Sequence, residues 1–99
     1  MTIVISWLTD AIPSARVVMD THSVDLDGFD LARAGRLRLD GGAWVAPSAW
    51  DAPAGGHHRD GTLAFAALDR KVFDAARTIE LELVDVAAPS RILRWERTS

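Results

Sequence analysis

Apolar and polar residues alternate along most of this chain with a period of two, which is the pattern of strands that bury one face. Residues 2–8 follow this pattern, and Pro13 interrupts it. Residues 16–24 form the next predicted strand. On the outward face of that strand, Asp20 and His22 are two positions apart, so we expect their side chains to lie next to each other.

Further along the chain the same alternation predicts more strands. Residues 36–39 and 43–46 are the predicted arms of a hairpin, because the Asp-Gly-Gly between them supplies residues that tolerate a tight turn. A polar crossover over residues 69–77 has an apolar anchor at Val72 and Phe73. The remaining predicted strands cover residues 62–67, 78–86 and 90–97.

Residues 25–35 are the one stretch where a helix competes with a turn. Asp30 can cap residues 31–34, and Gly35 can close the turn after them. Because this stretch holds only about one helical turn, which is too short to be stable alone, we interpret it as a capped turn between strands.

About seven short strands with turn signals about every 8–12 residues are typical of an antiparallel sandwich. We therefore predict a single all-β domain over residues 1–99, an antiparallel immunoglobulin-like β-sandwich of about seven strands. Trp44, Trp50 and Trp95 are expected to supply much of its core.

The composition fits this fold and excludes several classes of function. The chain has 99 residues, enough for one core, with 48% hydrophobic and 25% charged residues. The net charge is −3 with acids and bases interspersed, so nucleic acid is not an expected partner. The sequence contains no cysteine, which excludes disulfides, thiolate metal sites and thiol nucleophiles.

The apolar opening of the chain does not predict a membrane segment. The run over residues 3–8 is too short for a membrane-spanning helix, and it lacks the basic start of a signal peptide. We expect a soluble domain without a membrane span.

Candidate chemistry gathers in two segments, residues 20–23 and 50–63, which contain all three histidines. The second segment is predicted to be an irregular loop up to residue 61, because it contains Pro53 and a pair of glycines. We expect paired sheets to bring the two segments together. The predicted binding residues are Asp20, His22, Trp50, Asp51, His57, His58 and Arg59.

Two sequence patterns in these segments carry a resemblance. Asp-Thr-His-Ser-x-Asp-Leu occupies residues 20–26, and Trp-Asp-x-Pro-x-Gly-Gly-His-His occupies residues 50–58. Together with residues 81–86, and over roughly 15–96, the chain resembles a group of uncharacterised bacterial β-sandwich domains. The resemblance implies an envelope or extracellular setting and leaves the activity open. This chain departs from the group in starting at Met1 without an export signal.

The histidines suggest a transition-metal site as one alternative. Imidazoles beside carboxylates suit zinc, copper or nickel, so His22 with His57 or His58 is a conceivable ligand set. Adjacent residues of an extended chain point apart, however, so the pair can share one ion only if the backbone bends. The simpler interpretation is that one histidine of the pair packs on Trp50 while the other meets solvent.

Other chemistry has weaker support. Asp25, Asp27 and Asp30 are acidic enough to suggest calcium, but their order does not fit an EF-hand loop, and each also serves as a turn former or cap. Ser23 beside His22 lacks the strand-turn context of a hydrolase nucleophile.

Arg59 and Asp60 are expected to form a surface pair or a turn-forming dipeptide. The leading hypothesis is a non-catalytic binding or structural interaction module for a protein or small ligand. A transition-metal binder is the first alternative to this module, and a hydrolase is the weaker one.

Overall fold

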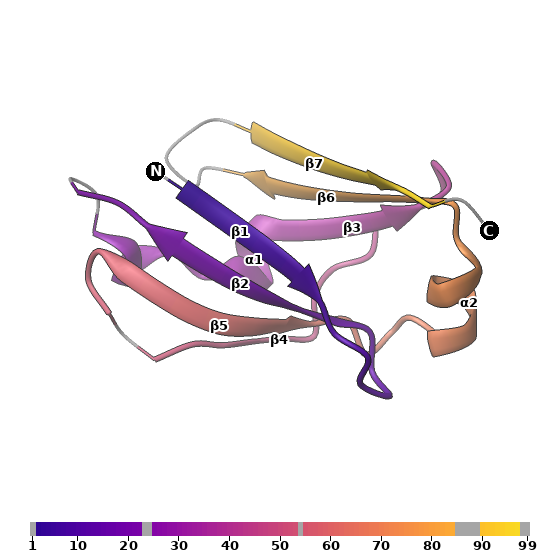
Figure 1. Cartoon of the computed structure of the whole chain (residues 1–99), viewed down its shortest axis with the longest axis horizontal. Coiled ribbons are helices and arrows are strands. Elements are labelled where there is room, and N and C mark those ends of the chain that lie inside the picture. Colours follow the sequence, from indigo (N-terminus) through magenta and orange to yellow (C-terminus); the bar gives the residue numbers. More distant parts are fainter. Residues whose placement is uncertain (1, 23–24, 54, 85–89, 98–99) are drawn as a thin grey trace.

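The computed structural model describes residues 2–22, 25–53, 55–84 and 90–97. In these ranges the chain is mostly β, with seven antiparallel strands in two sheets that pack as a sandwich (Figure 1). One sheet has the strand order β1-β2-β5-β4, and the other has the order β3-β6-β7. The elements are β1 (Thr2–Trp7), β2 (Ser14–Asp20), the 3-10 turn η1 (Leu26–Gly28), α1 (Leu31–Ala34), β3 (Gly35–Leu39), β4 (Ala49–Asp51), β5 (His58–Ala64), α2 (Arg70–Ala75), β6 (Thr78–Val84) and β7 (Ser90–Glu96).

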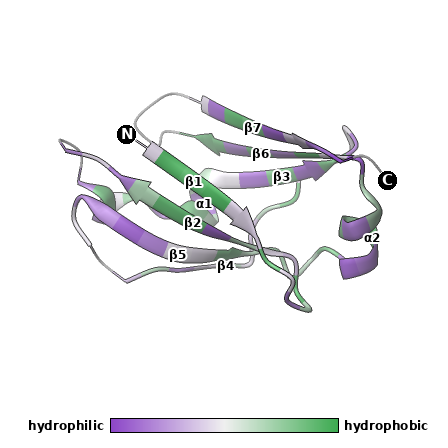
Figure 2. Cartoon of the chain, in the orientation of Figure 1, coloured by the Kyte–Doolittle hydropathy of each residue, from purple (hydrophilic) through white to green (hydrophobic). Residues whose placement is uncertain are grey.

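The predicted alternation places the core between the two sheets. Along β6, Ile79, Leu81 and Leu83 are fully buried, and along β2 the same is true of Val17 and Met19. Figure 2 shows that the strands also differ from one another, because the middle of β1 is hydrophobic whereas much of β5 is hydrophilic. The sandwich therefore forms because each sheet has one apolar face to remove from water.

Three of the four tryptophans pack against the core. The Trp7 ring lies 5.2 Å from both Trp95 and Phe73, measured between ring centroids, and Trp50 packs on the same cluster. Trp44 does not, which corrects the prediction that this residue is a core tryptophan: it lies against arginine side chains of β3.

The predicted hairpin between residues 36–39 and 43–46 forms only in part. On one edge of β3 the second predicted arm contributes a single antiparallel bridge, between Leu37 and Val45. On the other edge β3 pairs along its whole length with β6, whose apolar residues extend the core and whose glutamates lie opposite the arginines of β3.

The strand boundaries near the histidines also differ from those predicted. β5 begins at His58, four residues before the predicted start, and part of the predicted loop forms the short strand β4. β2 ends at Asp20, so His22 lies beyond the strand and does not continue its outward face.

The predicted capping residues are confirmed. The Asp30 side chain accepts a hydrogen bond from the backbone N–H of Ala32 at the start of α1, and Gly35 is the C-cap. The crossover contains α2, in which Phe73 is buried but Val72 is 58% exposed, so only one of the two predicted anchors reaches the core. No helix in the described ranges is long and apolar enough to cross a membrane.

Candidate functional site

The two histidine-bearing segments lie side by side, as the sequence predicted, because β2 and β5 are antiparallel neighbours (Figure 1). Asp20 lies directly opposite His58, and its carboxylate is hydrogen-bonded to Nδ1 of that imidazole. Beyond the strand end, the backbone N–H of Thr21 donates to the carbonyl of His57 at 2.9 Å. The side chains of Asp20 and His58 are 54% and 61% exposed, so this pair faces solvent.

The other two histidines do not complete a metal site. His22 is exposed and lines a pocket of about 180 Å³ with Thr2, Asp20 and Thr21. His57 is exposed in the turn before β5. Among the described residues, no three His, Cys, Asp or Glu side chains are grouped so that they could hold a metal ion. The geometry therefore gives no support to a zinc or copper site at these histidines.

Trp50 and Arg59 are turned away from the exposed histidines and into the sandwich. Trp50 lies opposite the buried Leu63 in the β4–β5 register, and Arg59 is only 8% exposed. The Arg59 guanidinium lies 5.6 Å from the centre of the Trp50 ring, so an arginine takes the place predicted for a histidine. Asp51 lies on the opposite face of β4 from Trp50 and is exposed.

The Arg59 guanidinium joins β5 to two other segments through their backbone carbonyls. It donates to the carbonyls of Leu26 and Phe29 at 3.1 and 2.8 Å. It also donates to those of Ala52 and Pro53 at 2.9 and 3.3 Å. Since a buried guanidinium is stable only when its donors find acceptors, these bonds explain why a charged side chain can occupy an inward position.

The predicted surface pair between Arg59 and Asp60 is wrong, because successive residues of a strand point to opposite faces. Asp60 points outward and is paired with Arg16 of the neighbouring strand, whose Nε donates to its carboxylate at 2.9 Å. The hydrogen bond from Arg16 holds the pKa of Asp60 below its usual range.

Asp27 holds the glycine turn that precedes the paired histidines. Its Oδ1 accepts hydrogen bonds from the backbone N–H groups of Gly55 and Gly56 at 2.8 and 3.1 Å. These donors hold the pKa of Asp27 below its usual range. Asp25 in turn accepts from the N–H of Asp27, and Asp30 caps α1. The acidic run therefore organises the backbone, and these carboxylates do not converge on a common point within the described residues.

A second surface, which the sequence reasoning missed, covers the outward side of the three-stranded sheet. Its residues come from β3, β6, β7 and the loop after β3, and we call it the Trp44 face. It consists of Arg36, Arg38, Trp44, Glu80, Glu82, Ile92 and Arg94.

The Trp44 ring is held by two arginines. The guanidinium carbons of Arg36 and Arg38 lie 4.2 and 4.5 Å from the ring centroid, a distance typical of cation–π contact. Each arginine is fixed from below by a glutamate of β6. Arg38 forms two hydrogen bonds with Glu80, at 3.0 and 3.2 Å, and Nε of Arg36 donates to Glu82. The ring therefore rests on two side chains that are themselves held in place.

The two glutamates are buried although they lie on an outward face. Glu80 and Glu82 are each 8% exposed. The hydrogen bond from Arg38 holds the pKa of Glu80 below its usual range, and those from Ser90 and Arg36 do the same for Glu82. The carboxylates thus stay ionised beneath the arginines. Solvent meets the side chains of Arg36 and Ile92 on this face, which are 46% and 55% exposed, and the exposed ion pair of Arg94 and Glu96 beside them.

A sequence signal for this face exists. Arg-x-Arg at residues 36–38 and Glu-x-Glu at residues 80–82 each place two like charges on one side of a strand. Opposite charges stabilise neighbouring strands, so the two motifs together indicate that these strands are adjacent.

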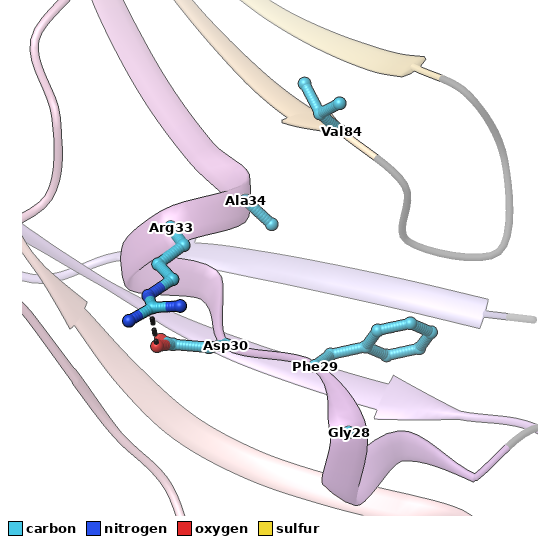
Figure 3. A pocket seen from close by; sticks show the side chains of 6 residues that line it. All are labelled: Gly28, Phe29, Asp30, Arg33, Ala34 and Val84. Carbon is cyan, nitrogen blue, oxygen red and sulfur yellow. Dashed lines mark ion pairs between the residues drawn. The ribbon is translucent and has the colours of Figure 1, made fainter.

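A further pocket of about 370 Å³ lies beside α1 (Figure 3). It is lined by Gly28, Phe29, Asp30, Arg33, Ala34 and Val84. Its two charged groups, Asp30 and Arg33, form an ion pair at 3.9 Å, and Asp30 also caps the helix. Both charged side chains are mainly exposed and already partnered, so we assign no ligand to this pocket.

No protein-family model, curated protein sequence or solved structure matches this chain. The resemblance to bacterial envelope domains therefore stays a prediction, and the function has to be argued from the side chains themselves.

Proposed function

We propose that this chain is a non-catalytic interaction module and that its recognition surface is the Trp44 face. The observation that carries this proposal is the clamp of Arg36 and Arg38 on Trp44. Tryptophan and arginine are the residues most enriched among those that dominate binding energy at protein interfaces. Side chains that are already fixed before binding lose little conformational entropy when a partner arrives.

The chemistry of the face favours an acidic partner with an apolar group. The buried glutamates leave the guanidinium of Arg36 as an accessible positive charge, because its side chain is 46% exposed. Arg94 is 56% exposed but is paired with Glu96, which is 74% exposed. The terminal nitrogens of Arg36 donate no hydrogen bond to the described residues, so they can bind a carboxylate. Trp44 and Ile92 supply apolar contact beside that charge. We therefore expect an extended or loop segment rich in Asp and Glu.

The setting of the Asp20–His58 pair supports a non-catalytic role. Both side chains are more than half exposed, whereas catalytic pairs are usually sheltered from solvent in a cleft. The exposed members of the predicted patch, Asp20, His22, Asp51, His57 and His58, form an alternative recognition surface at the other sheet.

The strand order supports an immunoglobulin-like topology. Seven-stranded constant-type immunoglobulin domains pair strands A, B, E and D in one sheet and C, F and G in the other. The orders β1-β2-β5-β4 and β3-β6-β7 correspond to these two sheets strand by strand. Because the chain contains no cysteine, aliphatic side chains occupy the core where antibody domains carry a disulfide. Such sandwiches commonly serve as binding modules, which agrees with the proposed role.

The proposal can be tested by selecting ligands from a displayed library of random peptides against the purified domain. We expect the selected peptides to be rich in Asp and Glu. Trp44→Ala is expected to weaken their binding by about tenfold or more, since hot-spot truncations cost about 2 kcal/mol or more. Val72→Ala, at an exposed position on α2, serves as the matched control and is expected to leave binding unchanged.

Two results would count against the Trp44 face. Selected peptides without acidic residues would contradict the claim that the arginines of this face bind carboxylates. Peptides that bind Trp44→Ala normally but lose affinity for His58→Ala would move recognition to the histidine surface. The fold of each variant is checked by its far-UV circular dichroism and urea unfolding curve.

A further inference from the structure

The two sheets end in four edge strands, and three of these are protected against pairing with another chain. β4 has only three residues. β3 is covered by the bridge between Leu37 and Val45, which exchange two backbone hydrogen bonds. β7 has charged side chains at Arg91, Arg94 and Glu96. Short length, covering segments and charge are the usual devices that keep sheet edges apart.

Within the described residues, β1 has none of these protections. Its six residues, Thr2–Trp7, include no charged residue, proline or glycine, and the middle of the strand is hydrophobic in Figure 2. Val4 is 52% exposed on its outward side. A hollow of about 440 Å³ borders its start and is lined by Thr2 and Ile3 together with Arg91, Ile92 and Leu93 of β7. The described residues therefore leave the N-terminal end of the β1 edge accessible to another strand.

We propose that β1 pairs with β1 of a second copy of this chain, antiparallel and about a twofold axis at Val4. In this register Val4 lies opposite its own copy, Ile3 lies opposite Ile5, and Thr2 lies opposite Ser6. Each pair matches in character: β-branched apolar residues meet each other, and the two small hydroxyl residues meet each other. The sequence of the strand is thus complementary to itself, which is what an isologous contact requires.

Charges on the outward face favour the same pairing. Within the sheet, Thr2 lies beside Asp20 and Ser6 lies beside Arg16. Across the proposed interface, the two symmetry-related rows through Thr2 and Ser6 therefore run from Asp20 of one copy to Arg16 of the other. These two rows end in opposite charges, and the central row between them pairs Val4 and Val18 with the same residues of the second copy.

The contact is small, so the dimer should be weak. Six residues from each edge bury less area than the roughly 1,200 Å² or more of stable complexes. The dimer is therefore expected to form with rising protein concentration. It involves the edge of the four-stranded sheet, whereas the Trp44 face belongs to the other sheet, so either proposal can fail without the other.

Analytical ultracentrifugation over a range of protein concentrations tests the dimer. Val4→Lys places two ammonium groups opposite each other on the axis and is expected to weaken the dimer by about tenfold or more. Val4→Thr keeps a β-branched, uncharged residue and is expected to retain it. Val72→Lys adds the same charge at another exposed valine and should leave the dimer unchanged.

Single cysteines test the register, since the natural chain contains none. Residues directly opposite in an antiparallel pair have Cα atoms about 4.5–5.5 Å apart, within the range a disulfide can span. Val4→Cys should therefore oxidise to a disulfide-linked dimer. Thr2→Cys mixed with Ser6→Cys should cross-link as a heterodimer faster than either variant cross-links alone. Val72→Cys is the control and should stay largely monomeric.

Several outcomes would overturn the proposal. A chain that stays monomeric at the highest concentrations would refute it. The same conclusion follows from a dimer that is unaffected by Val4→Lys, or from equal cross-linking of the cysteines at positions 4 and 72. Growth into larger oligomers would also contradict a closed twofold contact.

Discussion

Replacing Arg59 tests whether a buried guanidinium joins the loops to the sheet. In Arg59→Ala the carbonyls of Leu26, Phe29, Ala52 and Pro53 lose their donor at the same time. The 3-10 turn η1 and the loop after β4 would then be held to β5 by fewer contacts.

The expected loss of stability follows from the burial of these bonds. A hydrogen bond from a charged donor is worth about 1.5–3 kcal/mol when buried, and a typical one about 0.5–1.5 kcal/mol. The bond to Leu26 is buried, and the other three are partly buried. We count the bond to Leu26 as a buried bond from a charged donor and the three partly buried bonds near the lower end of the range for a typical bond. Their sum is a loss of about 3–4 kcal/mol in the free energy of unfolding for Arg59→Ala.

Two further variants separate charge from geometry. Arg59→Lys keeps the charge but offers a single nitrogen, so it cannot reach acceptors in all these segments and should recover less than half of the loss. Arg33→Ala removes an arginine whose side chain is 90% exposed, and we expect a change within about 0.5 kcal/mol.

The measurement is urea unfolding followed by tryptophan fluorescence, with the free energy of unfolding extrapolated to water. A loss below about 1 kcal/mol for Arg59→Ala, or full recovery by lysine, would refute the claim that the guanidinium fork holds these segments.

Three other predictions concern the core, the turn and pH. Leu81→Ala should cost about 3 kcal/mol or more in urea unfolding, and Ile92→Ala, at an exposed site, much less; similar losses would contradict the assigned faces. Gly55→Ala should lower the Tm, because the added Cβ would lie 1.8 Å from the backbone carbonyl oxygen of His58. The control Gly28→Ala places its Cβ where no atom lies within 4 Å, and equal Tm values for the two variants would contradict the close turn at Gly55. The pKa of Glu82 is lower in the folded than in the unfolded chain, so its contribution to stability is complete above the unfolded pKa and is lost as pH falls through the folded value. Below about pH 4.5, Glu82→Gln should therefore lose less stability than the natural chain, and parallel pH profiles would contradict the pairing.

The sandwich could be predicted because its strands carry a strict period of two. Ile79, Leu81 and Leu83 share one side of β6 in the sequence and are all buried in the structure. Partners far apart in the chain were harder to predict. Residues 36–39 have a turn directly after them, so a local hairpin costs less loop-closure entropy than pairing with residues forty or more positions away.

The inward position of Arg59 had a partial signal in the sequence. Leu63 was expected to face inward, and continuing the same alternation towards the N-terminus places residues 61 and 59 on that side. A charge at such a position is acceptable only if acceptors surround it, and these come from η1 and from the loop after β4. Alternation predicts the side of the strand, but it does not reveal the carbonyls that meet the guanidinium there.

The most direct test of the proposed recognition surface is an NMR titration of the domain with a selected acidic peptide. The four tryptophans give four indole N–H signals. Trp44 lies on the proposed surface, whereas Trp7, Trp50 and Trp95 pack against the core. The account predicts that the Trp44 signal shifts on binding together with the backbone amides of Arg36 and Arg38. An unchanged Trp44 signal, with shifts confined to the amides of His57 and His58, would contradict it.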